Sequence, residues 1–126
     1  MKYLTFMRHS EKFRETPPPQ ALMAAMGEFI EKTARAGALV DTAGLLPSKD
    51  GALLQLRKGE LLVTDGPFTE AKEVIGGYAI LQADTRDAVM RIAREFMELH
   101  RKHWPGFEGE CEVRPLFPEA AAPEHR

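Results

Sequence analysis

The sequence predicts an α+β fold of the duplicated split β-α-β kind, with a β-hairpin inserted between its two halves. Three observations predict it. Two segments carry apolar residues at the three- and four-residue spacing of helices, and short alternating or apolar segments on either side read as strands. Between the halves, two further strand-like segments flank a two-residue turn. The order is therefore strand, helix, strand, hairpin, strand, helix, strand.

The first half begins with residues 2–8, whose alternation and aromatic content suit a central strand. Helical spacing starts after Pro19, because proline fits the start of a helix but not its interior. Gly37 is placed to end that helix, since glycine readily adopts the left-handed conformation found there. Residues 38–46 then predict a strand, with a break or bulge at Gly44.

The hairpin consists of residues 53–57 and 60–64, joined at Lys58 and Gly59. Glycine accepts the positive φ that such a turn requires. Residues 65–68 follow directly and cannot extend the ladder, because proline has no backbone donor and Asp-Gly favours a turn. A shaped loop is expected to end the second strand of the hairpin.

The second half begins with an apolar strand at residues 78–83, expected to pair near the first strand. Asp84 or Thr85 can cap the amphipathic helix that follows, and this helix ends at Trp104 with the Pro-Gly step after it. Residues 110–116 alternate as the last strand. The expected apolar face of the helix comprises Val89, Ile92, Ala93, Phe96, Met97 and Leu99.

Residues 1–117 are expected to form one domain, and residues 118–126 a polar C-terminal tail. Two helices can cover only one face of the antiparallel sheet. We assign alternate strand residues to the other face, namely Tyr3, Thr5, Leu45 and Ile80. A second copy of the chain is the simplest cover for this face, which predicts a homodimer.

Composition excludes several classes of protein. The 126 residues are 44% hydrophobic and 29% charged, which is ordinary for a globular domain, and the net charge of −2 predicts no direct nucleic-acid partner. No apolar run reaches 18 residues and the N-terminal segment is too short for a signal peptide, so we expect a cytoplasmic protein with no membrane partner. Cys111 is the sole cysteine, which excludes an internal disulfide. The sequence predicts no cofactor and no metal site.

Residues 65–78 combine three features: Asp65-Gly66-Pro67-Phe68, the charged step Glu70-Ala71-Lys72-Glu73, and Gly76-Gly77-Tyr78 at a strand start. Together they resemble the signature of the DGPF-domain, or YCII-related, family. Residues 1–3, 44–48 and 112–116 are similar to that family too, so the resemblance covers about residues 1–117. It implies a ferredoxin-like fold that pairs as a dimeric α/β barrel.

The resemblance also bears on function. YciI-type relatives are described as enzymes with a His–Asp pair in a pocket, the histidine lying near the start of the first helix. Residues 17–26 of this chain contain no histidine, so that pair is not carried over. Some DGPF proteins are encoded with, or fused to, extracytoplasmic-function sigma factors. This favours a second interpretation, a regulatory module.

Asp65 is the first candidate for catalysis, because a rigid Gly-Pro turn holds its carboxylate where it could act as a base. The alternative is that its oxygens accept hydrogen bonds from its own turn. His9 is the second candidate, since a strand-end histidine can exchange protons near neutral pH. Neighbouring Arg8 could hold a carboxylate or phosphate. Both could equally mark the point where the chain leaves the core.

Three further residues are candidates for ligand binding: Glu70, Lys72 and Tyr78. The first two are charged loop residues that could lie at a pocket rim or simply be solvated. His100 and His103 lie three residues apart on the second helix, as metal ligands do, but the favoured interpretation is that protonated histidines suit a helix C-terminus. Cys111 is flanked by two glutamates, which would raise the pKa of its thiol.

The sequence therefore supports two functions. The first is a dimeric small-molecule protein with a pocket near the Asp65–Phe68 loop and proton-transfer or lyase-type chemistry. The second is a non-enzymatic binding or regulatory module associated with the transcription machinery. A pocket in which titratable groups converge would favour the first.

Overall fold

The computed structural model describes residues 1–67 and 73–118. Its strands and helices follow the predicted order: β1 (Lys2–His9), α1 (Gln20–Arg35), β2 (Leu39–Gly44), β3 (Ala52–Arg57), β4 (Glu60–Asp65), β5 (Val74–Gln82), α2 (Arg86–His103) and β6 (Gly109–Pro115). Two short 3-10 helices, Glu11–Arg14 and Ser48–Asp50, were not predicted. Glu70, Lys72 and residues 119–126 of the expected tail lie outside the described residues.

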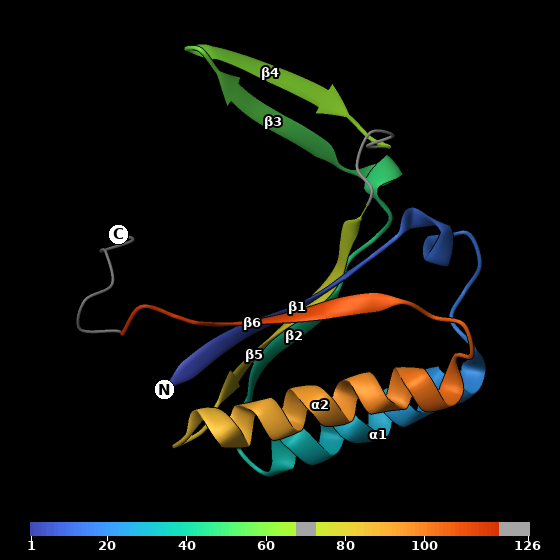
Figure 1. The fold of residues 1–126 in the computed structure, drawn as a ribbon, viewed down its shortest axis with the longest axis vertical. Helices are drawn as coiled ribbons and strands as arrows, with labels where there is room; N and C mark the ends of the chain where they lie inside the picture. The colour runs from blue at the N-terminus through green and yellow to red at the C-terminus, as the bar shows by residue number, and fades with distance from the viewer. Residues whose placement is uncertain (68–72, 119–126) are drawn as a thin grey trace.

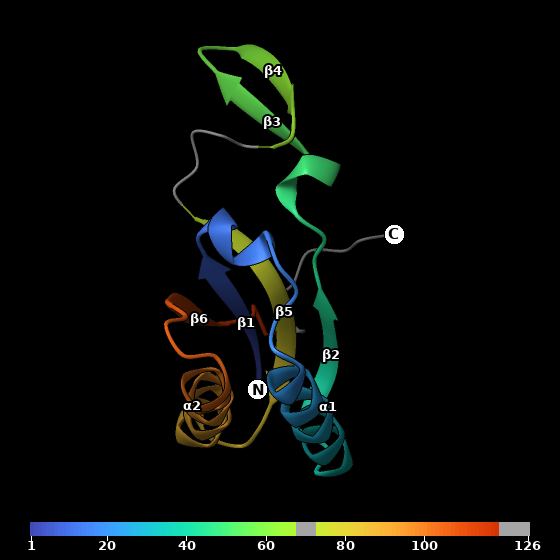
Figure 2. The same ribbon diagram turned by 90° about the vertical axis from the view of Figure 1, so that its right-hand side faces the viewer.

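Four strands form an antiparallel sheet in the order β2-β5-β1-β6. Both α-helices lie against the same face of this sheet, and no α-helix of residues 1–67 and 73–118 covers the opposite face (Figures 1 and 2). An α+β fold with two helices and antiparallel sheets is consistent with a ferredoxin-like fold. We call the face toward the helices the inner face and the opposite one the outer face.

Local sequence signals account for the ends of the elements. The Thr85 hydroxyl accepts a hydrogen bond from the Ala88 backbone amide at 3.1 Å and so caps α2. Gly37 follows α1 with a φ of 77°. Lys58 and Gly59 both have positive φ, as a tight hairpin turn requires. These predictions are confirmed because each depends on contacts within a few residues.

The assignment of the two faces was partly wrong. Tyr3 and Thr5 lie on the inner face, where Tyr3 packs with Leu81 and Val89 in the core. Ile80 pairs with Leu4 and lies on the outer face, as expected. A period of two shows that side chains alternate, but both faces of β1 carry apolar residues. The pattern therefore cannot tell which set meets the helices.

The irregularity expected at Gly44 occurs elsewhere in β2. Register against β5 shifts between Leu39 and Asp41, while Gly44 pairs regularly with Gly77. A side chain on Gly77 would meet the Ala43 carbonyl oxygen at 3.0 Å. Glycine is therefore needed there for close approach of two backbones.

The hairpin of β3 and β4 is a separate two-stranded sheet. It extends away from the four-stranded sheet on the side opposite the helices (Figures 1 and 2), and we call it the arm. The Gly66 amide donates a hydrogen bond to the Gly51 carbonyl at its base.

Within residues 1–67 and 73–118, neither helix combines the length and apolar character required to cross a membrane.

Candidate functional site

A cavity of about 630 Å³ lies between the inner face of the sheet and the two helices. This volume is within the range of small-molecule sites. Its walls are mainly apolar and come from both layers, and they include Met7, Leu22, Met26, Phe29, Ile92 and Phe96. The polar side chains of the lining include two histidines, four threonines, the cysteine and two charged residues: His9, His100, Thr5, Thr16, Thr33, Thr42, Cys111, Arg14 and Glu15.

His9 closes β1 and is buried, with 6% of its surface exposed. Its Nδ1 lies 3.0 Å from the Ser10 carbonyl oxygen, and a carbonyl only accepts, so Nδ1 carries the hydrogen. Nε2 of the neutral ring then bears a lone pair. No side-chain nitrogen or oxygen that is fully buried in the described part of the chain lacks a partner, so this unpaired Nε2 must be open to the cavity.

Gly76 makes room for the His9 ring. It is the extra residue where the β1–β5 register shifts between Met7 and Arg8. A Cβ on Gly76 would lie 2.2 Å from Nε2 of His9, which no side chain could tolerate without displacing the ring. The Gly-Gly pair of the sequence motif therefore has a steric role beside the histidine.

His100 reaches the same cavity from α2 and is also buried. Its Nδ1 lies 3.0 Å from the Phe96 carbonyl oxygen, so this ring too carries its hydrogen on Nδ1. Burial lowers the pKa of His100, the bond to the Phe96 carbonyl partly opposes this, and the electrostatic influence of His9 lowers it further. The neutral ring is favoured, which leaves a second Nε2 as an acceptor.

Aromatic rings surround the His9 end of the cavity. The Phe107 ring lies 6.0 Å from that of His9 and 5.1 Å from that of His100, measured between centroids. Phe13 packs against Trp104 and Phe107 at 5.6 and 4.9 Å. This cluster joins the end of α2 to the segment after β1. It also limits the access of water to the histidines.

Three of the four threonines in the cavity lining donate their hydroxyl hydrogen to a backbone carbonyl. Thr5 donates to Ala79 at 3.0 Å, and Thr42 donates to Tyr78 at 2.9 Å. Thr33 donates to the carbonyl of its own helix one turn before, at 2.7 Å. These hydroxyls can therefore only accept from a ligand. Together with the two Nε2 atoms, they make the interior of the cavity rich in acceptors.

Cys111 also lines the cavity, and burial raises the pKa of its thiol. The predicted direction is confirmed, but the cause is different. Strand alternation places Glu110 and Glu112 on the outer face, so their charges do not act on the sulfur. The thiol is the favoured form, and it is a poor nucleophile.

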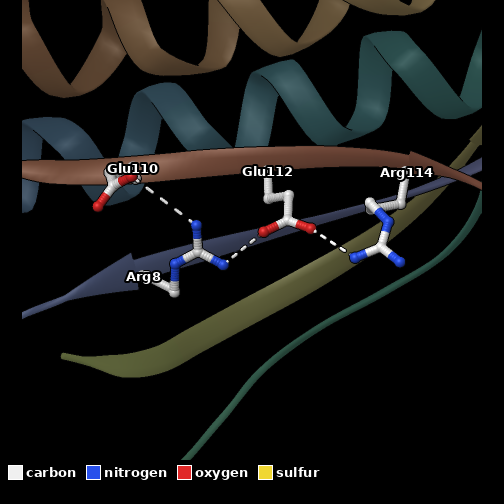
Figure 3. Close-up of polar contacts among 4 residues, drawn as sticks. All are labelled: Arg8, Glu110, Glu112 and Arg114. Atoms are coloured by element: carbon white, nitrogen blue, oxygen red, sulfur yellow. Dashed lines mark hydrogen bonds and ion pairs between the residues drawn. The ribbon is translucent and has the colours of Figure 1, made fainter. Parts of the chain in front are cut away.

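Arg8 lies on the outer face, where its guanidinium forms ion pairs with acidic residues (Figure 3). It contacts Glu112 at 2.6 Å and Glu110 at 3.8 Å, and Arg114 reaches the other Glu112 oxygen at 2.9 Å. The hydrogen bond to Glu112 raises the pKa of Arg8, while Arg114 first and then Arg8 lower the pKa of Glu112. Arg8 and His9 are neighbours in sequence, yet the sheet separates their side chains.

The remaining described candidates do not present a titratable group to this cavity. Asp65 ends β4 in the arm, where it is exposed and pairs with Ala52. The Tyr78 hydroxyl donates to Asp41 at 2.9 Å, a bond that raises the pKa of Tyr78. Tyr78 and its β1 partner Phe6 are both among the residues that line the cavity, but the Tyr78 hydroxyl is bonded to Asp41. Of the two catalytic candidates, Asp65 and His9, only His9 lines the cavity.

His100 was misinterpreted from sequence. It was expected as a protonated residue at a helix end, whereas it is buried and its pKa is lowered. A signal was present, because Val89, Ala93, Phe96 and His100 follow the four-, three- and four-residue spacing of one helix face. His103 is half-buried and does not line the cavity. No three potential ligand side chains gather as a metal site among the residues that the structure describes.

Two comparisons with known proteins bear on this chain. The family model for the YCII-related domain matches residues 1–100. A curated protein of Rhizobium meliloti (strain 1021), whose own name calls it uncharacterized, is 31% identical over 97 residues. That match covers 77% of this chain and 74% of the relative.

Proposed function

Since the chain belongs to the YCII-related family, we propose that it is a small-molecule protein of that family whose cavity lies between the sheet and the helices. The ligand is a small, largely apolar molecule that carries an acidic hydrogen, and Nε2 of His9 takes that hydrogen as a proton. The observation that carries this proposal is the pair of buried histidines. Each donates its Nδ1 hydrogen to a backbone carbonyl, and no residue that the structure describes bonds its Nε2.

The chemistry follows from the acceptor-rich interior. A ligand O–H, N–H or C–H beside a carbonyl donates its proton to Nε2 of His9, and the Ser10 carbonyl stabilises the resulting imidazolium through Nδ1. In a lyase-type step, the electron pair of the broken C–H bond forms a double bond and expels a leaving group. The proton on Nε2 then passes to that group. Neutral His100 accepts a second hydrogen bond and positions the ligand.

This proposal moves the predicted pocket away from the Asp65–Phe68 loop. Asp65 is exposed in the arm, whereas His9 has an enclosed apolar environment in which proton transfer is shielded from water. We therefore assign the base to His9. The lyase-type outcome depends on the ligand, and proton abstraction is the step that the protein supplies.

The test is hydrogen–deuterium exchange into a panel of small cyclic ketones in D₂O, followed by NMR. His9→Gln should reduce the exchange rate about 10²–10⁴-fold, the usual contribution of a general base. His103→Gln is the matched control, because His103 lies outside the cavity lining, and it should exchange like the wild type. Unchanged exchange in His9→Gln would show that the base lies elsewhere. Failure of every ketone to shift the His9 and His100 ring signals would contradict a ligand site in this cavity.

We also propose that two copies pair through their outer faces as a dimeric α/β barrel. The support is the composition of this face. Leu4, Phe6 and Ile80 lie beside a row in which Glu110, Arg8, Glu112 and Arg114 alternate in charge. The row has no net charge, and a two-fold axis can set its acidic members beside the basic members of the other copy.

A further inference from the structure

One face of the arm is apolar across both strands. Leu54 pairs with Val63, and Leu56 pairs with Leu61, so the four side chains lie together on one side of the ladder. They are 61%, 63%, 74% and 63% exposed in that order. We call this set the apolar arm face. The opposite, mixed face carries two leucines and four polar residues: Leu53, Leu62, Gln55, Arg57, Glu60 and Thr64.

An arm of this kind needs a partner. Two-stranded hairpins are at best marginally stable in water, and stability usually requires a third strand or packing on another element. The turn at Lys58 and Gly59 favours the hairpin locally, but the apolar arm face has no cover among the residues that the structure describes. Contiguous exposed apolar side chains mark an interaction surface.

The position of the arm indicates a second copy of this chain as that partner. The arm leaves the chain after β2 and returns before β5, and it lies on the side of the sheet that carries the outer face (Figures 1 and 2). A body that covers the outer face therefore lies beside the arm. The outer face and the apolar arm face are two uncovered surfaces on the same side of one molecule.

The area needed by a dimer favours the same occupant. Four strands about 4.8 Å apart and about 7 residues long have a flat footprint of about 450 Å². A standard stable interface buries about 800 Å² on each partner. The two strands of the arm add about 200 Å² per copy on the same geometry. On this geometry the arm enlarges the footprint open to a second copy by nearly half over that of the sheet face alone.

We propose that the arm of each protomer packs its apolar face on the partner protomer, so that a pair of chains is held by two reciprocal arms. The interface is isologous, because each copy both extends an arm and receives one. This inference builds on the outer-face pairing proposed above and is independent of the chemistry in the cavity.

Sedimentation velocity of the full chain at a series of concentrations tests it. Leu56→Glu places a charge on the apolar arm face, and we expect it to raise the dimer dissociation constant at least about tenfold. Gln55→Glu adds the same charge one residue earlier, on the mixed face, and should leave that constant within about threefold. Dimers of Leu56→Glu as tight as the wild type would overturn the arm contact.

Two further measurements separate the possible failures. Phe6→Glu disrupts the outer face: if Leu56→Glu dissociates while Phe6→Glu pairs normally, the arm contact stands and outer-face pairing is wrong. If the wild-type chain is monomeric at about 100 μM, both the arm contact and the outer-face pairing are wrong, and the partner of the arm would be a different protein. Circular dichroism checks that each variant folds. If Leu56→Glu does not fold, Val63→Lys replaces it with the same expected loss of pairing.

Discussion

Adjacent residues of β1 serve opposite sides of the sheet. Arg8 projects to the outer face and is neutralised by two glutamates, while His9 projects to the cavity and keeps one nitrogen free. A pleated strand enforces this separation at every step. The charged row that contains Arg8 and the site that contains His9 therefore lie on opposite faces of the sheet, although these two residues are neighbours in sequence.

The lowered pKa of His100 predicts how stability depends on pH. Burial lowers this pKa below the ordinary value of 6.5, so the unfolded chain binds the proton more readily than the folded one. The folded state is then favoured fully above that value and loses stability as the pH falls below it, by up to about 1.4 kcal/mol per pH unit. The loss stops once the folded state itself takes up the proton.

Urea unfolding at about pH 7.5 and about pH 5.5 measures this loss. The wild type should lose more unfolding free energy between the two conditions than His100→Gln, which retains a polar side chain that does not titrate. Carboxylates elsewhere contribute equally to both proteins, so the difference isolates residue 100. Identical pH dependence in the two proteins would mean that His100 titrates as freely in the folded state as in the unfolded one.

Helix α1 is held in place by the packing of the side that faces the sheet. No side chain caps its N-terminus, which follows Pro19, whereas Leu22 in its first turn is fully buried. The first turn of α1 is therefore held by apolar packing, whereas that of α2 is held by the hydrogen bond of the Thr85 cap. Leu22 also forms part of the cavity wall.

Leu22→Ala should lower the unfolding free energy by about 2–5 kcal/mol, the usual cost of removing a buried leucine. The adjacent Met23 is 53% exposed, and Met23→Ala should cost less than about 1 kcal/mol. Chemical denaturation of the two variants beside the wild type provides the comparison. Equal losses would indicate that the helix has another orientation on the sheet.

For the whole molecule, the fully buried apolar core is small, and apolar groups remain uncovered on the outer face and the arm. Phe6 lies near the middle of the outer face, between Tyr78 of β5 and Glu112 of β6. A surface of this kind is more stable when it is removed from water, and the proposed pairing with a second copy would achieve this through a single symmetric contact.

Light scattering of the wild type should therefore give the mass of a dimer, and Phe6→Glu should give that of a monomer at the same concentration. The charge would be buried without a matched partner in the pair, but it is tolerated in the separate chain. Arg91→Glu, on the exposed side of α2, is the control and should remain dimeric. A wild type with the mass of one chain would contradict the proposed pairing.

Much of the fold could be predicted from the residues alone. The order of the strands and helices, the hairpin turn at Lys58-Gly59 and the Thr85 cap were all predicted and are confirmed. Each depends on backbone conformations and hydrogen bonds within a few residues, and the residue types of a short segment predict these. The YCII-related family was likewise identified from contiguous residues.

Which face of β1 meets the helices, and which polar side chains share a site, depend on how the helices and strands pack together. Tyr3 and Thr5 were assigned to the wrong face, and the site pairs His9 with His100, which was predicted to be a protonated histidine at a helix end. The physical reason is distance along the chain. Alternation and helical spacing describe each strand or helix separately. The cavity depends on how α2 packs across β1, and interactions between residues close in sequence do not indicate that packing.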